Sequence, residues 1–261
     1  MALTFTVLGC GNSTGVPAAG NYWGKCNPDE PKNKRTRPSL LVQSSTTTIV
    51  IDTGPDFSLQ ATHHDINQID AVLYTHSHGD HVHGIDDLKI YAKAKPDGIL
   101  PAFTNHETIL ELKRRFYYLF EGGNESIYQT MLQTHALDNR YGQTVTIGDI
   151  NFIPFEQTHG KVRSVGYRFS DFAYSTDMKH LNAQSLDILR GVKTWIVDSA
   201  GYHQENNPVH ASLKEIYALN EYVQAQNVYL TSLSLAMDYE TMKSELPDGY
   251  LPLYDGKTFT V

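Results

Sequence analysis

One six-residue segment constrains this chain more than any other feature of its sequence. Residues 76–81 read His-Ser-His-Gly-Asp-His and directly follow the apolar run at residues 71–74. That run predicts a short buried strand, and a strand that ends in such a loop holds the ligand side chains on a rigid support. Imidazole and carboxylate groups are ligands that zinc, manganese and iron bind. The segment therefore predicts a metal site at the end of a strand.

The spacing within this segment favours two metal ions over one. His76 and His78 are two residues apart, so an extended backbone projects both imidazoles to the same side. Asp80 and His81 follow after a turn and point toward a second position. The alternative is a solvated, histidine-rich turn, but further His and Asp residues in suitable positions downstream argue against it.

The composition is typical of a globular protein. The chain has 261 residues, of which 40% are hydrophobic and 19% charged. This length suits one domain or two closely fused halves, and we expect a single domain over residues 1–261. No run approaches the ~20 consecutive apolar residues that span a bilayer, and the first residues do not resemble an export signal. Cys10 and Cys26 are the two cysteines and do not suggest a disulfide framework. We therefore expect a cytoplasmic protein without a membrane partner.

The charge distribution bears on the partner. The net charge is -8, and the densest basic cluster is the short stretch at residues 32–37. An acidic chain with one small basic loop argues against broad nucleic-acid binding. A small anionic substrate is the expected partner, and a homodimer is an assembly that the sequence leaves open.

Strand and helix patterns alternate along the chain. Strands are predicted at residues 4–8, 40–43, 47–51, 71–74, 144–147, 151–155, 165–169, 172–175, 194–197 and 228–230, with a closing strand pair within residues 250–261. Helices are predicted at residues 56–63, 107–120, 181–189, 210–223 and 237–246. The first four strands should form one sheet and the later strands a second. Two strand-rich halves with helices outside predict a four-layer αββα sandwich.

Two further ligand candidates each follow a predicted strand. His159 comes after the strand at residues 151–155, and Asp177 comes after the strand at residues 172–175. A lone His or Asp at a strand end usually caps or turns the chain. A two-metal site, however, needs a third imidazole and a bridging carboxylate from elsewhere, and these two residues would supply them.

Together these features resemble the metallo-β-lactamase superfamily of metallohydrolases over nearly the full chain. The resemblance rests on residues 76–81, on Ile51-Asp52-Thr53-Gly54 before them, and on His159 and Asp177. Within that superfamily the sequence is similar to phosphoribosyl cyclic phosphate phosphodiesterases of the PhnP type. That similarity is carried by Leu8-Gly9-Cys10-Gly11 with Gly15-Val16-Pro17, by Thr158-His159-Gly160-Lys161, and by residues 246–256. The tRNA 3′-processing endonucleases are also relatives, but the sequence has no Gly/Pro-rich arm of the kind that grips tRNA.

The resemblance implies a role for each candidate residue. One metal, Zn²⁺ or Mn²⁺, would be held by His76, His78 and His159, a second by Asp80 and His81, and both by the bridging Asp177. Such a pair holds a hydroxide that attacks phosphorus, and Asp80 would orient it.

Residues outside the ligand set also receive roles from the resemblance. His210 corresponds to a histidine that protonates the leaving oxygen, with a surface helix cap as the alternative. Asp52 would hold the ligand loop in place. Lys161, Arg35 and Arg37 are candidates for contacting a phosphate, although exposed basic residues are usually only solvated.

Two positions depart from the family pattern. Ser232 stands where the family has its last metal-binding histidine, in Leu230-Thr231-Ser232-Leu233, and serine is a poor metal ligand. The second metal site should therefore be weakened. In the polar loop at residues 18–38, PhnP-type enzymes carry a cysteine-rich structural zinc site, whereas this chain has only Cys26. A structural zinc is not expected there.

The expected function is that of a metal-dependent phosphodiesterase acting on a small or cyclic phosphodiester through a metal-activated hydroxide. The second hypothesis is a lactone or thioester hydrolase of the same fold, because the same hydroxide attacks carbonyl groups. The third is a metal-binding protein with little activity, because Ser232 replaces the expected ligand. Fold alone does not separate these functions.

Overall fold

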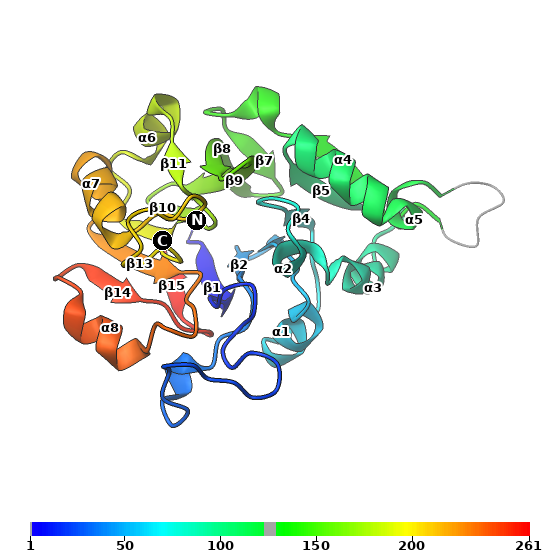
Figure 1. The fold of residues 1–261 in the computed structure, drawn as a ribbon. Helices are drawn as coiled ribbons and strands as arrows, with labels where there is room; N and C mark the ends of the chain where they lie inside the picture. The colour runs from blue at the N-terminus through cyan, green and yellow to red at the C-terminus, as the bar shows by residue number, and fades with distance from the viewer. Residues whose placement is uncertain (1, 123–128) are drawn as a thin grey trace.

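The computed structural model describes residues 2–122 and 129–261, which form two packed β-sheets with helices on both outer faces (Figure 1). Within these residues the first sheet has seven strands in the order β15-β1-β2-β3-β4-β5-β6. They are β1 (Thr4–Gly9), β2 (Ser39–Gln43), β3 (Thr48–Ile51), β4 (Ala71–Leu73), β5 (Leu100–Thr104), β6 (Leu132–Ala136) and β15 (Thr258–Thr260).

The second sheet, as far as the chain is described, has eight strands. Seven follow the order β11-β8-β9-β10-β12-β13-β14, and β7 pairs with β8. They are β7 (Val145–Ile147), β8 (Ile150–His159), β9 (Val162–Phe169), β10 (Phe172–Ser175), β11 (His180–Leu181), β12 (Thr194–Asp198), β13 (Asn227–Thr231) and β14 (Tyr250–Pro252).

The helices cover the outer faces of the two sheets (Figure 1). The α-helices are α1 (Phe57–His63), α2 (Gly79–Val82), α3 (Leu88–Lys93), α4 (His106–Arg115), α5 (Tyr117–Phe120), α6 (Ala183–Leu189), α7 (Leu213–Val223) and α8 (Tyr239–Glu245). The 3₁₀ helices are η1 (Pro31–Asn33), η2 (Ile85–Asp87) and η3 (Asp138–Arg140). No helix in the described ranges combines the length and apolar character needed to cross a membrane.

Both faces of the first sheet are buried, and successive strand residues point to opposite faces. Phe5 and Val7 belong to the core between the sheets, whereas Leu8 belongs to a second core beneath α1, α3 and α4. Phe5 stacks on Phe172 of the second sheet with the ring centroids 3.8 Å apart. Helices α6 and α7 pack into the core of the second sheet. The predicted αββα sandwich is therefore confirmed.

Each sheet changes from antiparallel to parallel pairing along its strand order. The change falls at β3 in the first sheet and at β10 in the second. The carboxyl ends of neighbouring parallel strands lie at one edge, where open α/β sheets commonly place their ligand sites. Asp52 follows β3, His76 follows β4, Asp177 follows β10, Asp198 ends β12 and Ser232 follows β13. The fold thus gathers polar side chains from both sheets.

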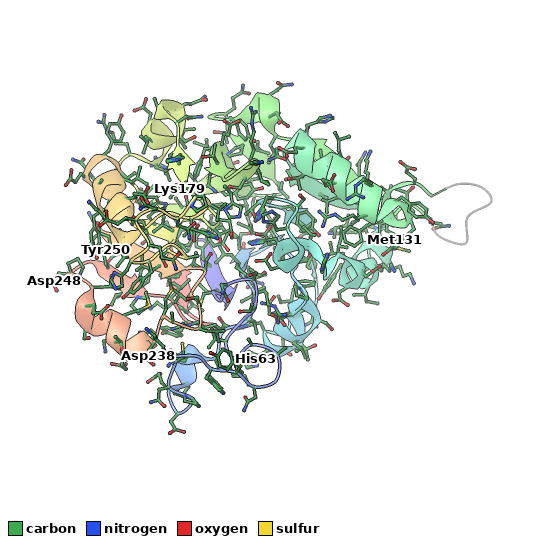
Figure 2. All side chains as sticks on the ribbon, viewed as in Figure 1. His63, Met131, Lys179, Asp238, Asp248 and Tyr250 are labelled. Atoms are coloured by element: carbon green, nitrogen blue, oxygen red, sulfur yellow. The ribbon has the colours of Figure 1, made fainter. Side chains whose placement is uncertain are left out.

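Hydrogen bonds to the segment before α8 hold the polar loop at residues 18–38 in place. Arg35 is buried and donates to the Met237 carbonyl at 2.7 Å, and Asn33 donates to Asp238 Oδ2 at 2.6 Å. Figure 2 labels Asp238, which precedes α8 and lies beside this loop. Cys26 directs its thiol at the Leu235 carbonyl, 3.6 Å away, and belongs to no metal-binding cluster among the described residues.

Three predicted elements need correction. The helix predicted over residues 107–120 breaks at Phe116, where φ is -124° and ψ is 36°, so α4 and α5 are separate. The closing strands do not pair with each other: β14 pairs with β13 in the second sheet, and β15 pairs with β1 in the first. The helix predicted from residue 210 begins at Leu213, after the capping residue Ser212.

Candidate metal centre

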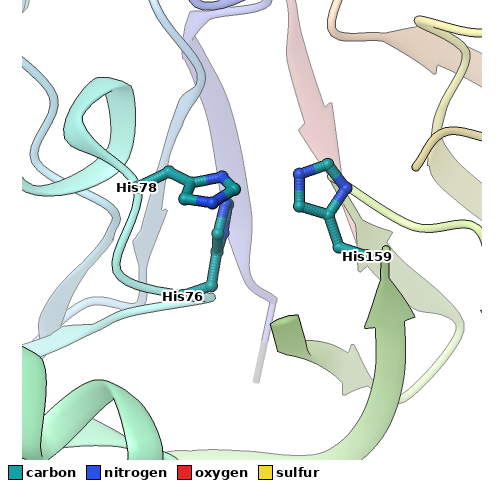
Figure 3. Close-up of side chains that lie close together, drawn as sticks. All are labelled: His76, His78 and His159. Atoms are coloured by element: carbon teal, nitrogen blue, oxygen red, sulfur yellow. The ribbon is translucent and has the colours of Figure 1, made fainter. Parts of the chain in front are cut away.

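Side chains from both sheets converge where the strand ends meet. The ligand atoms of His76, His78 and His159 lie within 4.8 Å of one another, and so do those of His76, His81 and Asp177. His76 belongs to both groups. Figure 3 shows His76 and His78 on the loop after β4 and His159 at the end of β8, with their rings grouped around one point.

Asp177 connects the two groups because each of its oxygens faces a different one. Asp177 Oδ1 lies 3.7 Å from His159 Nε2, and Asp177 Oδ2 lies 3.0 Å from His81 Nε2. Asp80 Oδ2 lies 3.4 Å from the same His81 nitrogen. We call His76, His78, His159 and Asp177 Oδ1 the imidazole half-site. Asp80, His81 and Asp177 Oδ2 form the carboxylate half-site.

Hydrogen bonds on the far side of the rings fix which ring nitrogen faces the centre. Asp52 is fully buried, and its Oδ2 lies 2.7 Å from His81 Nδ1 and accepts from Thr75 Oγ1 at 2.8 Å. The Thr75 hydroxyl proton is thereby used, so the 3.0 Å contact to His76 Nδ1 has the imidazole as its donor. A neutral imidazole with a proton on Nδ1 keeps its lone pair on Nε2. His76 therefore presents the Nε2 lone pair to the centre, and His81, whose Nδ1 is held by Asp52, directs its Nε2 to the same place.

The donor set fits divalent metal ions. The Nε2 atom of His76 is buried and has no hydrogen-bond partner among the described residues, and the buried Nε2 of His81 faces the carboxylate oxygens of Asp177 and Asp80. His159 Nδ1 donates to the Val209 carbonyl at 2.8 Å, which leaves its Nε2 free as well. Buried polar atoms without partners are rare in folded proteins. Imidazole nitrogens grouped around a shared carboxylate are donors that suit zinc and its neighbours.

The electrostatics of the centre also favour a cation. Burial lowers the pKa of His76 well below its usual range, which keeps this imidazole neutral. Burial acts in the same direction on His81, but Asp177, Asp52 and Asp80 outweigh it and raise its pKa well above the usual range. Burial raises the pKa of Asp177, yet His81 and His76 hold it well below the usual value. Three carboxylates thus surround one imidazole with negative charge.

Ser232 lies in the centre, at the position where the sequence predicts an altered ligand. Its side chain is buried, and its Oγ lies 3.0 Å from Thr176 Oγ1, which donates to Asp177 Oδ2 at 2.9 Å. Ser232, Asp177 and Asp52 all have positive φ, at 60°, 49° and 62°. Residues other than glycine adopt this conformation only where the surrounding structure holds them there.

His210 forms a charged pair that extends the site. Its Nδ1 lies 2.7 Å from Asp198 Oδ2, and that buried carboxylate also accepts from the Met178 and Ala200 backbone N–H groups. Burial lowers the pKa of His210, but Asp198, followed by Asp177, outweighs it and raises the pKa to about 9. The imidazole is therefore protonated at neutral pH.

His210 does not lie where the sequence predicts it, and Asp198 was not predicted as a site residue. His210 precedes the capping residue Ser212 by two positions, so it neither starts nor caps α7. The sequence reasoning missed Asp198. The sequence could have indicated Asp198 as a site residue, because it directly follows the buried strand predicted at residues 194–197. Asp177 likewise comes shortly after a predicted strand.

A cavity of about 380 Å³ opens onto the centre. His78, Asp80, His159 and Asp177 line it together with His210. The remaining wall consists of small or polar residues, namely Asn12, Ser13, Pro38, Ala200, Ser232 and Ser234. Among the described residues, neither lysine nor arginine contributes to this wall.

The three basic residues proposed as phosphate contacts lie elsewhere. Arg35 is buried, and its donors reach the Lys32 and Met237 carbonyls and Asn33 Oδ1. Arg37 pairs with Asp56, with Nη1 and Oδ1 2.9 Å apart. Lys161 is exposed in the turn between β8 and β9. The sequence could not show that Arg35 and Arg37 lie outside the cavity wall, because their hydrogen-bond and ion-pair partners are set by tertiary structure.

Comparison with known proteins agrees with this geometry. The family described as Beta-lactamase superfamily domain matches residues 47–231. A crystal structure of a new diphosphatase from the PhnP family is 30% identical, with a TM-score of 0.87, and the match covers 100% of this chain and 98% of that one.

Two curated relatives match in part. The octanoyltransferase of Porphyromonas gingivalis is 30% identical over 210 residues, which are 80% of this chain and 41% of that protein. Ribonuclease Z of Methanopyrus kandleri is 32% identical over 143 residues, which are 53% of this chain and 45% of that protein. The chain therefore spans less than half the length of these curated relatives. The family match, together with the fold and the His/Asp centre, shows that the chain belongs to the metallo-β-lactamase superfamily of metal-dependent hydrolases.

Proposed function

We propose that this protein is a metal-dependent phosphodiesterase that acts on a small phosphodiester, cyclic esters included. One observation carries the proposal: six potential metal ligands and a histidine held by a buried carboxylate meet beside a cavity of about 380 Å³. The PhnP-family diphosphatase and the ribonuclease Z among the relatives support phosphorus as the point of attack.

Some residues of the centre would hold metal ions, and another would donate a proton. The imidazole half-site would hold one divalent cation, Zn²⁺ or Mn²⁺, and the carboxylate half-site a second. Two such cations supply an activated water at neutral pH and positive charge against the phosphate oxygens. Asp80 lines the cavity and can accept a hydrogen bond from the attacking water.

His210 would act as the general acid. Asp198 holds its Nδ1, so Nε2 is the nitrogen left to donate a proton to the leaving oxygen. Its charge also makes it the cationic side chain of a cavity wall that has neither lysine nor arginine among the described residues. Asn12, Ser13 and Ser234 offer an amide and hydroxyl groups to the rest of the substrate. This wall suits a small polar ester.

A second candidate function is hydrolysis of an acyl substrate, such as a lactone or a thioester. The P. gingivalis relative, whose name denotes acyl transfer, favours it. The same activated water would attack a carbonyl carbon in place of phosphorus.

Substrates that share the same leaving group, p-nitrophenol, distinguish between these two functions. We would compare bis-p-nitrophenyl phosphate with p-nitrophenyl acetate and octanoate on protein loaded with Zn²⁺ or Mn²⁺. A phosphodiesterase should hydrolyse the phosphodiester, with a dependence on added metal, and accelerate the acyl esters far less. Turnover of the acyl esters alone would support the second function, and no metal-dependent turnover of any of them would contradict both.

A further inference from the structure

The two half-sites differ in the chemistry of their donors. The imidazole half-site has three ring nitrogens and one carboxylate oxygen. The carboxylate half-site has one ring nitrogen of its own, from His81, although His76 Nε2 of the first half-site also lies close to it. Its other donors are the oxygens of Asp80 and Asp177, with the Ser232 hydroxyl nearby in the same cavity. Imidazole suits zinc, while oxygen donors suit manganese and magnesium. The two half-sites should therefore discriminate between metals differently.

We propose that Ser232 makes the carboxylate half-site a position for a hard divalent cation such as Mn²⁺, while the imidazole half-site binds zinc. The protein would thus work with two different metals. This inference rests on the two-metal centre of the proposed function, but not on the identity of the substrate.

Ser232 takes part in an ordered arrangement that supports an oxygen-rich half-site. Its Oγ lies 3.0 Å from Thr176 Oγ1, and the Thr176 hydroxyl donates to Asp177 Oδ2 at 2.9 Å. That oxygen is the one that faces His81 Nε2 at 3.0 Å. All three hydroxyl and carboxylate side chains are buried, so water competes weakly for these contacts. The pair of hydroxyls thereby fixes the carboxylate oxygen that the half-site depends on.

The expected effect is a change in selectivity, because zinc binds most sites more tightly than manganese does. An imidazole ligand adds more to the affinity for zinc than to that for manganese. Removing a residue that only supports a ligand costs ~10–100-fold in metal affinity, so an absent ligand should cost at least as much. When zinc is limited to one equivalent and manganese is in excess, zinc should fill the imidazole half-site and manganese the other.

The first experiment uses the wild-type protein alone. Protein stripped by a chelator receives one equivalent of Zn²⁺ and an excess of Mn²⁺, and elemental analysis follows gel filtration. We expect one zinc and one manganese per chain. The electron paramagnetic resonance spectrum should show isolated Mn²⁺, without the coupling of a manganese pair. Zinc without bound manganese, or a coupled manganese pair, would overturn the proposal.

The second experiment measures how strongly zinc displaces the manganese. Buffered free Zn²⁺ is raised stepwise over the mixed-metal protein, and the Mn²⁺ signal is followed. Ser232→His should lose its manganese at a free zinc concentration at least ~10-fold lower than the wild type, because imidazole restores a preference for zinc. Displacement at the same zinc concentration in both proteins would overturn the role of Ser232.

Two further variants test the hydroxyl pair. Thr176→Val keeps the side-chain shape but removes the donor to Asp177, so it should weaken Mn²⁺ binding, and Thr176→Ser should restore it. Ser234→Ala is the matched control, because Ser234 lines the same cavity but its Oγ accepts from the Ala236 N–H at 3.3 Å. Equal Mn²⁺ affinity in the Val variant and the control would overturn the role of Thr176. None of these readouts involves turnover, so a protein that binds both metals yet cleaves no phosphodiester would contradict the proposed function alone.

Discussion

At the scale of single residues, His210 and Asp198 determine where the site holds a positive charge. The carboxylate fixes one ring nitrogen at 2.7 Å and raises the pKa of His210 to about 9 against the effect of burial. A general acid must be protonated at the working pH and must have a nitrogen free to donate. His210 meets both conditions, which makes it testable independently of the metal ligands.

Replacing His210 tests proton donation to the leaving group. His210→Ala should lower kcat by ~10²–10⁴ for a phosphodiester with an alkyl leaving group. The loss should be much smaller for p-nitrophenyl esters, whose leaving group needs no proton. Metal content, measured by elemental analysis, should stay near that of the wild type. Equal losses for both leaving groups would argue against this role.

Replacing Asp198 tests how the charge on His210 is maintained. Activity that requires protonated His210 should fall as the pH rises through its pKa. In Asp198→Asn the largest favourable interaction is gone, so the pKa of His210 should drop and the alkaline fall in kcat should move to lower pH. The pH profile of kcat for an alkyl phosphodiester checks this. An unchanged alkaline limb would show that Asp198 does not set the charge.

At the scale of secondary-structure elements, tertiary contacts give the basic residues of the loop at residues 18–38 structural roles in place of the predicted phosphate contacts. Arg35 is buried and donates to three acceptors, while Arg37 is a partly exposed side chain paired with Asp56. The first should matter for stability and the second hardly at all. Neither lies in the cavity wall, so neither should bind the substrate phosphate directly.

A comparison of two substitutions tests this distinction. Arg35→Met leaves buried acceptors without donors and should lower the free energy of unfolding by ~2–4 kcal/mol. Arg37→Met removes a partly exposed ion pair and should change the free energy of unfolding by at most about 1 kcal/mol. Urea denaturation of both variants gives the two values. A larger effect at Arg37, or a raised KM in folded Arg35→Met with unchanged stability, would contradict the assignment.

At the scale of the whole molecule, the residues proposed as metal ligands could be picked out from the sequence because each follows a local pattern. The segment at residues 76–81 and the residues His159 and Asp177 all come after apolar or alternating runs that read as strands. Their convergence, in contrast, depends on how two sheets pack, and the family resemblance supplied that expectation.

Elements that depend on distant partners could not be predicted in the same way. The pattern does not predict β6, whose residues are mostly exposed or half-buried and show no clear alternation. Strand β15 joins β1, more than 250 residues earlier, through pairs such as Thr260 with Thr4. Local sequence favoured its pairing with neighbouring β14 instead. The roles of Arg35 and Arg37 were missed for the same reason.

The most direct test of the two-metal phosphodiesterase is to measure metal content and turnover together in the wild type and His76→Ala. The ligand atom of His76 belongs to both groups of metal donors, so this change should remove bound metal and hydrolysis of bis-p-nitrophenyl phosphate together. His63→Ala, at an exposed position in α1, should keep both and serves as the control. Full metal content and full turnover in His76→Ala would contradict the proposed centre.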